Sequence, residues 1–308
     1  MSATPIDRRT LMRLGLSGLG GLVLVSGMPS LGSSAEGTDA ALSPGAQDDF
    51  SFVQLSDVHL GFSGARVNPD SQGTLDKAVA AVNALDKRPE FVIFTGDLTH
   101  LVEDEAVRKS RMAAFMEAAG RLTAKTVRFM PGEHDASLDR GEMYQQFFGA
   151  MHYTFDVKGV HFIVLDNVSD PAAVIGQQQL DWLKADLAKL KTDARIVVFT
   201  HRPLFDLYPQ WDWNTKDGQS VIDVLMPYAN VTVFYGHIHQ EHHHSTGHIQ
   251  HHAALSLMFA LPAPGSLPKK APVPWDPASP YKGLGYRTVA ASSRQGPFLP
   301  LDLPVVRA

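Results

Sequence analysis

The chain has 308 residues, of which 44% are hydrophobic and 19% charged, and this composition excludes a collagen, a coiled coil or a wholly disordered chain. It has no cysteine, which excludes disulfides, cysteine-based zinc or iron–sulfur sites and a thiol nucleophile. The formal net charge of −5 argues against a broad basic surface, so no nucleic-acid polymer is expected as a partner. Histidine is abundant instead: eight of the 14 histidines lie between His237 and His252.

The first part of the chain, residues 1–35, has the pattern of an export signal rather than of a folded element. Arg8 and Arg9 precede a glycine-rich apolar run at 14–28, which is too short to form a stable membrane span. Small residues at 33–35 supply a cleavage site. The pattern resembles a twin-arginine signal, which implies a periplasmic or secreted protein and the twin-arginine export machinery as a partner. The alternative is a chance arginine pair before an uncleaved amphipathic anchor.

A polar linker at 36–48 leads into one domain, residues 49–308. Within this domain, β-rich apolar runs predict strands at 50–55, 91–95, 126–130, 161–165, 195–200 and 231–235. Further patterns predict helices at 74–85 and 177–190, a hairpin at 153–165, and late strands at 286–291 and 298–303. The alternation of strands and helices indicates an α/β fold, and the hairpin indicates a mixed rather than a purely parallel sheet.

Carboxylate and imidazole side chains follow five of the predicted strands. In chain order the segments are Asp57-Val58-His59, Gly96-Asp97, Gly132-Glu133-His134-Asp135, His201 and Gly236-His237-Ile238-His239. At an extended strand end the two outer residues of D-x-H or H-x-H point the same way, because side chains alternate. Ends of neighbouring strands meet at one edge of a sheet, where sites form in α/β proteins. We therefore expect a cluster that holds two metal ions, for which Mn, Fe or Zn is suited.

In this order the segments resemble the motifs of the calcineurin-like metallophosphoesterase family, over about residues 50–260. Among its members, the chain is similar to bacterial cyclic-nucleotide phosphodiesterases and to purple acid phosphatase-like proteins. The resemblance implies a four-layer α/β/β/α sandwich, with two mixed sheets packed face to face and flanked by helices. It also implies two metal ions with Asp97 as the bridge. One metal would be held by Asp57, His59, Asp97 and His239, and the other by Asp97, Glu133, His201 and His237.

The chain departs from the family pattern at two positions. Glu133 stands where the family has asparagine, and a ligating glutamate would add a negative charge, tighten metal binding and repel an anionic phosphate. The alternative is that Glu133 points away and water fills the gap. His100 lies three residues after Asp97, where purple acid phosphatases carry a tyrosine ligand, which argues against a purple enzyme. His100 is expected either beyond the metal ligands or at the surface rather than as a further ligand.

The resemblance implies hydrolysis of a small phosphate ester by a metal-activated hydroxide, with phosphodiesters favoured slightly over monoesters. His134 would give a proton to the leaving group, held in place by Asp135. Arg202, Trp211 and Trp213 follow His201 in an aromatic loop and are candidates to bind substrate, although packing of the loop explains both tryptophans equally well. The rival hypothesis is an exported, non-catalytic metal-binding protein that lost turnover through Glu133.

Two further segments leave their roles open. Residues 262–280 hold seven prolines and form either a surface loop or a lid that borders the site. Residues 241–252 are histidine-rich, and a β-hairpin turning at Thr246-Gly247 is expected there. Its alternate histidines could bind a third metal, buffer protons or contact substrate.

Overall fold

The computed structural model describes residues 49–64, 66–292 and 296–306. The expected export signal at 1–35 and linker at 36–48 lie outside these ranges. Among the helices inside them, none has both the length and the hydropathy that a membrane-spanning helix requires.

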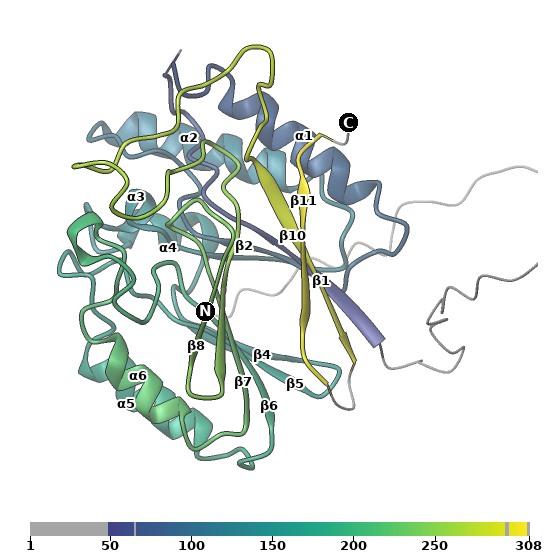
Figure 1. Ribbon diagram of the computed structural model, residues 1–308, viewed down its shortest axis with the longest axis vertical. Coiled ribbons are helices and arrows are strands. Elements are labelled where there is room, and N and C mark those ends of the chain that lie inside the picture. The colour runs from purple at the N-terminus through teal and green to yellow at the C-terminus, as the bar shows by residue number, and fades with distance from the viewer. Residues whose placement is uncertain (1–48, 65, 293–295, 307–308) are drawn as a thin grey trace, which may run out of the picture. The chain divides into compact units, whose positions relative to one another are not determined.

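One sheet has five strands in the order β11-β10-β1-β2-β3 (Figure 1). Strands β1, β2 and β3 are parallel, whereas β10 runs antiparallel to β1 and β11 antiparallel to β10. The strands are β1 (Asp49–Leu55), β2 (Phe91–Thr95), β3 (Val127–Met130), β10 (Gly285–Ser292) and β11 (Leu299–Pro304). Helices α1 (Ser71–Asn83) and α2 (Glu105–Ala119) cover its outer face. After β3 come the short helices α3 (Glu133–Ala136) and α4 (Glu142–Phe148).

The other sheet has six strands in the order β4-β5-β6-β7-β9-β8. Its four central strands are parallel, and antiparallel partners close it at both edges. The strands are β4 (Tyr153–Val157), β5 (Val160–Val164), β6 (Arg195–Phe199), β7 (Asn230–Tyr235), β8 (His242–Thr246) and β9 (Ile249–Ala253). Helices α5 (Gln177–Leu187) and α6 (Gly218–Leu225) pack on the outer face, and a 3₁₀ turn spans Pro209–Trp211. Figure 1 shows these two helices on the opposite side from α1 and α2.

An aromatic core joins the inner faces of the two sheets. The ring of Phe52 in β1 stacks on Phe91 with 4.9 Å between centroids. It meets Phe162, Phe199 and Phe234 of the other sheet edge-on, at 5.8, 5.8 and 5.6 Å. Such edge-to-face packing is favourable for aromatic rings and leaves little freedom for one sheet to slide over the other. The separation of the two sheets is therefore fixed by side chains that the site does not use.

The α/β/β/α sandwich implied by the family resemblance is confirmed. The predicted strands and the hairpin at 153–165 match observed strands to within one or two residues. These strands read as nearly continuous apolar runs because both of their faces are covered, one by helices and one by the other sheet. Helices α2, α3, α4 and α6 were not predicted from the sequence. The hydrophobic residues of α2 are interrupted by charge, and only four of its side chains are buried.

Candidate metal centre

The proposed ligands lie in loops that follow β1, β2 and β3 in one sheet and β6 and β7 in the other. The cluster was expected at the edge of one sheet, but it forms where the carboxyl ends of two packed sheets meet. Backbone hydrogen bonds align the loops. The amide of His59 donates to the carbonyl of Asp97 at 2.8 Å, and the amide of Gly236 donates to the carbonyl of His201 at 3.0 Å.

The backbone at five of the ligands is left-handed. The φ angles are 54° at Asp57, 45° at His59, 49° at Asp97, 65° at His237 and 52° at His239. This conformation is uncommon for residues other than glycine and costs of order 1–3 kcal/mol each. The prediction of an extended strand end was therefore wrong: β1 and β7 stop before the ligands, and both side chains of each pair turn inward because the chain itself turns.

Two glycines allow these loops to approach each other closely. A Cβ atom at Gly132 would lie 2.1 Å from the backbone nitrogen of Asp97, and one at Gly236 would lie 2.0 Å from Oγ of Ser56. Any larger residue would force the ligand loops apart. Gly132 is thus required where the loops after β2 and β3 meet within one sheet, and Gly236 where a loop of the second sheet meets the loop after β1.

Two groups of donors lie side by side. The first contains Asp57, His59 and His239, with Nε2 of His239 at 3.2 Å from Oδ1 of Asp57 and 3.3 Å from Nε2 of His59. Asp97 lies between the groups. Its Oδ2 is 3.4 Å from Nε2 of His59 and 3.4 Å from Nε2 of His201.

The second group contains Glu133, His201 and His237. Oε2 of Glu133 is 2.9 Å from Nε2 of His201, and Oε1 is 2.8 Å from Nδ1 of His237. Glu133 therefore points into the site, and the alternative in which it turns away is wrong. The two groups match the two ligand sets that the resemblance implied.

The donors fit metal ions. Nε2 of His201 and Oε2 of Glu133 are buried and have no hydrogen-bond partner among the described residues, although they face each other. Unpaired buried polar atoms are costly, and a cation between them would satisfy both. Imidazole and carboxylate donors together suit Mn, Fe or Zn, so the structure leaves the identity of the metal open.

Backbone carbonyl groups fix which nitrogen three of the four ligand imidazoles present. Nδ1 of His201 is 2.8 Å from the carbonyl oxygen of Thr95, and Nδ1 of His239 is 2.8 Å from that of Phe259. A carbonyl only accepts, so these nitrogens carry the proton and Nε2 is left free to bind a metal. His237 is reversed: its Nε2 faces the carbonyl of Asp212 at 3.0 Å, and Nδ1 faces the site.

Burial and neighbouring charges set the protonation of the donors; they favour neutral rings at His59 and His237 but a proton on His201, which a metal ion would have to displace. Burial, followed by the neighbouring imidazoles, lowers the pKa of His59 well below its usual range, and burial also lowers the pKa of His237. Burial opposes ionisation of Glu133, but His237 and His201 bring its pKa well below the usual value. Burial works against a charge on His201 as well, yet Asp97 and Glu133 raise its pKa strongly. A proton on His201 thus supplies positive charge that a metal would otherwise provide.

Arg202, a predicted substrate-binding residue, lies against the second group. Its Nη2 is 3.5 Å from Oε1 of Glu133, and its Nη1 donates to the carbonyl of Asp212 at 3.1 Å. The guanidinium therefore offsets part of the charge that Glu133 adds.

Trp211 and Trp213 do not reach the site. They are 3% and 0% exposed and pack with Tyr235, Ile238 and Leu261 in an apolar cluster. Their prediction as substrate-binding residues was wrong, because this loop uses its aromatic rings to anchor itself beneath the site. Its contribution to the centre is the carbonyl of Asp212, which orients His237.

His134 lies at the site as predicted, but Asp135 does not hold its ring. Nδ1 of His134 accepts the backbone N–H of Leu101 at 3.1 Å. The carboxylate of Asp135 instead accepts the N–H groups of Gly132, Leu98 and Thr99 at 2.9–3.0 Å, and so ties the loop after β3 to the loop after β2. Burial and the charge of Asp97 raise the pKa of Asp135 to about 6. Asp135 is a positioning residue rather than a partner of His134.

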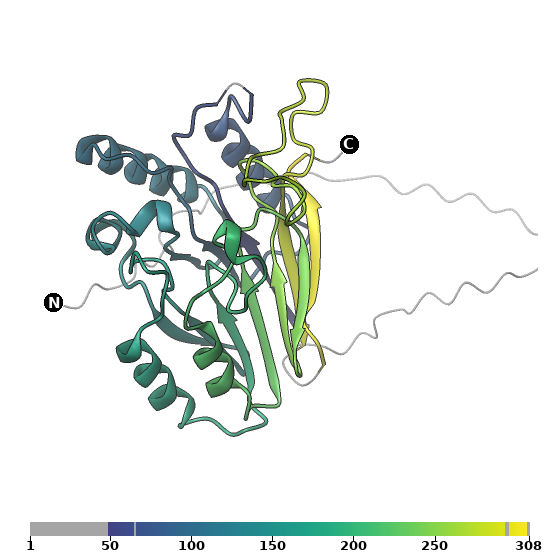
Figure 2. The ribbon, with the colours of Figure 1, turned by 60° about the vertical axis from the view of Figure 1, so that its left-hand side comes forward.

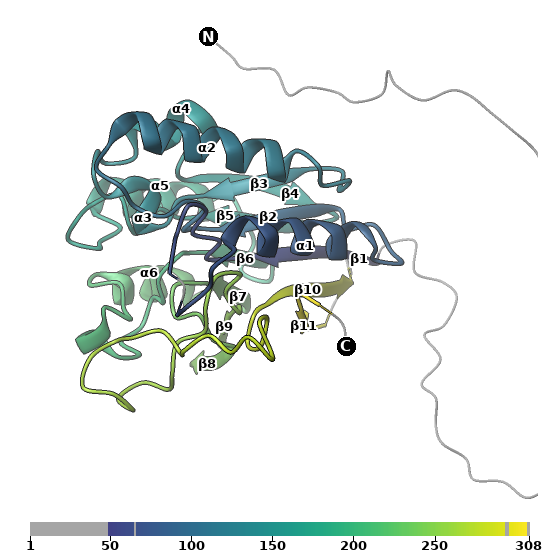
Figure 3. The same ribbon diagram turned by 90° about the horizontal axis from the view of Figure 1, so that it is seen from above.

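A hollow of about 140 Å³ opens over the donors. Besides six of the site residues already described, it is lined by Phe259, Leu261, Lys270 and Pro272. Two of these belong to the proline-rich segment 262–280, seen in Figure 3 as a long irregular loop, so this segment borders the site. Neither Phe259 nor Lys270 was predicted. The lysine pair Lys269-Lys270 among prolines gave a weak signal for Lys270, and nothing in the local sequence marked Phe259.

The remaining histidines lie around and beyond this hollow. Nδ1 of His100 is 3.3 Å from Nδ1 of His59. His59, His100 and His134 also form a group of nitrogens that could hold a metal ion, so a place for His100 beyond the metal ligands stays a prediction. The histidine-rich segment forms the predicted hairpin, β8 and β9, whose turn is Gly247-His248.

The model of the calcineurin-like phosphoesterases matches residues 50–241, which carry all of these ligands. The chain belongs to this family. A probable cyclic nucleotide phosphodiesterase of Rhodococcus erythropolis is 29% identical over 201 residues, covering 61% of this chain and 64% of that protein. Another probable cyclic nucleotide phosphodiesterase, from Synechococcus, is 30% identical over 257 residues and covers 73% and 88%. The chain therefore spans just under two thirds of the Rhodococcus protein.

A solved structure shares the fold. A dimetal phosphatase from Danio rerio superposes with a TM-score of 0.57 at 15% identity, covering 82% of this chain and 98% of that one.

Asp135→Asn is expected to lower both the stability of the fold and the affinity for metal. Asparagine keeps one acceptor oxygen and turns an amide group toward backbone N–H donors, which costs about 1–3 kcal/mol of unfolding free energy. Because these bonds hold the loops of Asp97 and Glu133 together, the metal content after equilibrium dialysis should fall as well.

Asp217→Asn is the matched control for this prediction. Asp217 also accepts two backbone N–H groups, from Ile175 and Gly176 at 2.8 and 2.9 Å, but away from the ligands. It should lose comparable stability and keep its metal. Full metal content in Asp135→Asn would contradict the positioning role.

Proposed function

We propose that the protein hydrolyses small phosphodiesters at a two-metal centre built from these two donor groups. The observation that carries the proposal is the pair of groups itself, joined by Asp97. When bound, two divalent ions would polarise the phosphoryl oxygens and lower the pKa of a water molecule between them. The first metal would be held by Asp57, His59, Asp97 and His239. The second would be held by Asp97, Glu133, His201 and His237.

The charge balance supports catalysis in spite of Glu133. Two divalent ions carry four positive charges, of which Asp57, Asp97 and Glu133 offset three. One positive charge remains, and Arg202 and Lys270 add to it at the second donor group and at the rim. The centre would therefore still attract a phosphate, more weakly than one with asparagine.

His134 is the proton donor that we propose for the leaving group. Because Nδ1 of His134 accepts the N–H of Leu101, a neutral ring carries its proton on Nε2. The residue also lines the hollow over the donors. It can therefore donate a proton to the alkoxide that leaves phosphorus.

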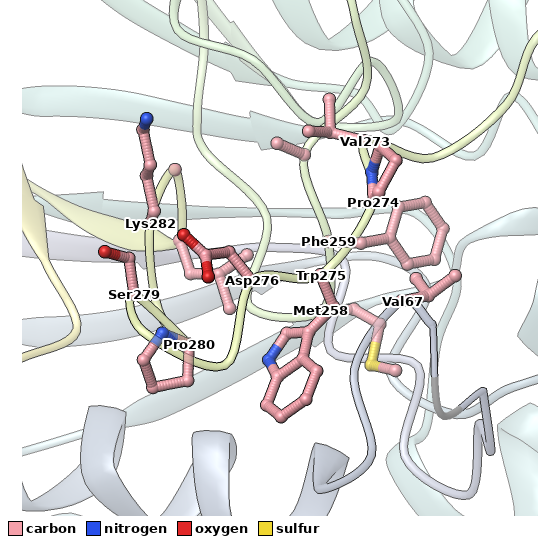
Figure 4. Close-up of a pocket in the computed structure, with 13 residues that line it drawn as sticks. Val67, Met258, Phe259, Val273, Pro274, Trp275, Asp276, Ser279, Pro280 and Lys282 are labelled. Atoms are coloured by element: carbon pink, nitrogen blue, oxygen red, sulfur yellow. The ribbon is translucent and has the colours of Figure 1, made fainter.

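A second hollow, of about 270 Å³, continues past Phe259, which lines both. Figure 4 shows Val67, Met258 and Phe259 on one side of it and the polar ends of Ser279 and Lys282 on the other. Trp275 adds a large flat surface, held by its backbone N–H bond to the carbonyl of Arg66 at 2.8 Å. A hollow with an apolar side and a polar side suits a ring-bearing alcohol such as a nucleoside. The second hollow therefore supports a substrate whose ester carries a large organic group.

The proposal is tested by hydrolysis of phosphate esters after reconstitution with Mn, Fe or Zn. Diesters should be hydrolysed, and activity should vanish when chelation removes the metals. His134→Ala should lose about 10²–10⁴-fold in kcat with an alkyl leaving group and far less with p-nitrophenolate, which needs no proton.

A protein shown to hold two ions and inactive on every ester would overturn the proposal and favour the non-catalytic hypothesis. In that event a Glu133→Asn variant that gains activity would identify Glu133 as the cause.

Trp275→Ala is expected to impair ring-bearing substrates selectively. Stacking on an aromatic side chain is worth about 1–3 kcal/mol, so kcat/KM for a nucleoside diester should fall by about 5- to 150-fold. Methyl p-nitrophenyl phosphate, which leaves the second hollow empty, should be unaffected, and Trp275→Phe should restore most of the loss. Equal losses on both substrates would argue against a binding role.

We also propose that the protein is exported through the twin-arginine machinery to the periplasm or beyond. The support is the sequence of residues 1–35, with Arg8 and Arg9 before an apolar run. Replacing both arginines by lysine should retain the protein in the cytoplasmic fraction of a bacterial host. Unchanged export of that variant would contradict the proposal.

A further inference from the structure

Six histidines of the β8–β9 hairpin take no part in the metal centre. The strands pair His243 with His252 and His244 with His251, directly opposite each other. Because side chains alternate along a strand, these two pairs lie on opposite faces of the hairpin.

The first face is packed rather than open. The ring of His244 stacks on Phe205 at 3.9 Å between centroids, and His251 meets the same ring at 5.2 Å. The centroids of His244 and His251 are 5.8 Å apart. On this face, Nδ1 of His242 is 2.9 Å from the hydroxyl of Tyr235. These side chains attach the hairpin to the loop after His201.

The second face brings two imidazole nitrogens together. Nδ1 of His243 and Nδ1 of His252 are 2.6 Å apart. Two bare lone pairs at this distance would repel, so something positive must lie between them, a proton or a metal ion. Oε1 of Glu241 is 3.2 Å from Nε2 of His243. A carboxylate at one ring nitrogen orients the ring and raises the basicity of the other nitrogen, as it does for many metal-binding histidines.

We propose that His243 and His252 bind a third transition-metal ion, separate from the dimetal centre, through their facing Nδ1 atoms. Two imidazoles close to carboxylates suit Cu²⁺, Ni²⁺ or Zn²⁺. With metal–nitrogen bonds of about 2.1 Å, the two nitrogens would be about 3.3 Å apart in a tetrahedral site. The gap must therefore widen by less than about 1 Å. His243 can supply this movement because its side chain is half exposed.

The surroundings favour binding. Burial, then His243 and Arg287, lowers the pKa of His252 to about 4, so its ring is neutral at ordinary pH. Figures 2 and 3 show β8 and β9 beside β10 and β11, and Arg287 in β10 donates to the carbonyl of Ala253 at 2.7 Å. In β11, Oδ1 of Asp302 is buried without a hydrogen-bond partner in the described part of the chain. The charges of Glu241 and His243 act on the pKa of this carboxyl group, so Asp302 interacts electrostatically with the hairpin.

The test uses the full chain with its dimetal centre already loaded with Zn²⁺, which binds such ligands more tightly than Mn²⁺ and gives no electron paramagnetic resonance signal. Cu²⁺ added in substoichiometric amounts should bind at one additional site, with an electron paramagnetic resonance spectrum that shows imidazole nitrogen ligands. His243→Ala should weaken this site at least tenfold, and His252→Gln should do the same while keeping a polar side chain of similar size. Because the readout is copper binding, the result does not depend on whether the protein hydrolyses esters.

His248→Ala is the matched control. His248 lies in the turn of the same hairpin, where its Nε2 contacts the carbonyl of Tyr228 at 2.7 Å. This variant should retain the additional copper site in full. Unchanged binding in His243→Ala, or equal loss in His248→Ala, would overturn the proposal.

Discussion

The convergence of three carboxylates in a buried space is the constraint on which the rest of this structure depends. Asp57, Asp97 and Glu133 would repel one another there if no positive charge lay among them. The surrounding architecture delivers that charge, as imidazoles from the second sheet and as a place for metal ions. Left-handed turns, glycines at close approaches and carbonyl groups that hold each ring all serve to bring the charges together.

The geometry of the centre is held by parts of the protein that never contact a ligand. Rings between the sheets, with Phe52 in their midst, set how far apart the two loop clusters lie. The backbone N–H of His237 then donates to both oxygens of Asp57, at 3.1 Å, and connects the two clusters directly. The rigid core around the ligands holds their left-handed backbone conformation, although that conformation is strained.

Most of the fold and nearly all of the donor set could be predicted from the sequence. Strands that are covered on both faces consist of consecutive apolar residues, and the ligands follow directly after these strands. What the sequence could not reveal depends on distant contacts. The local sequence around Trp213 is compatible with stacking on a substrate and with burial in a core. Only the packing of Leu261 and Tyr235 around its ring shows that it is buried. Asp135 follows His134 in the chain, yet its carboxylate turns to amides that lie 36 and 37 residues away. Phe259 reaches the site from a segment with no motif at all.

The hydrogen bond between His237 and Asp57 joins residues that are 180 positions apart. Closing so long a loop is entropically unfavourable until both sheets have formed, and β1 itself needs β10 from near the end of the described chain. The donor set is therefore complete only when both sheets are in place. Metal ions would bind the folded protein far more tightly than a chain that lacks one of its sheets, so metal binding would stabilise the whole fold.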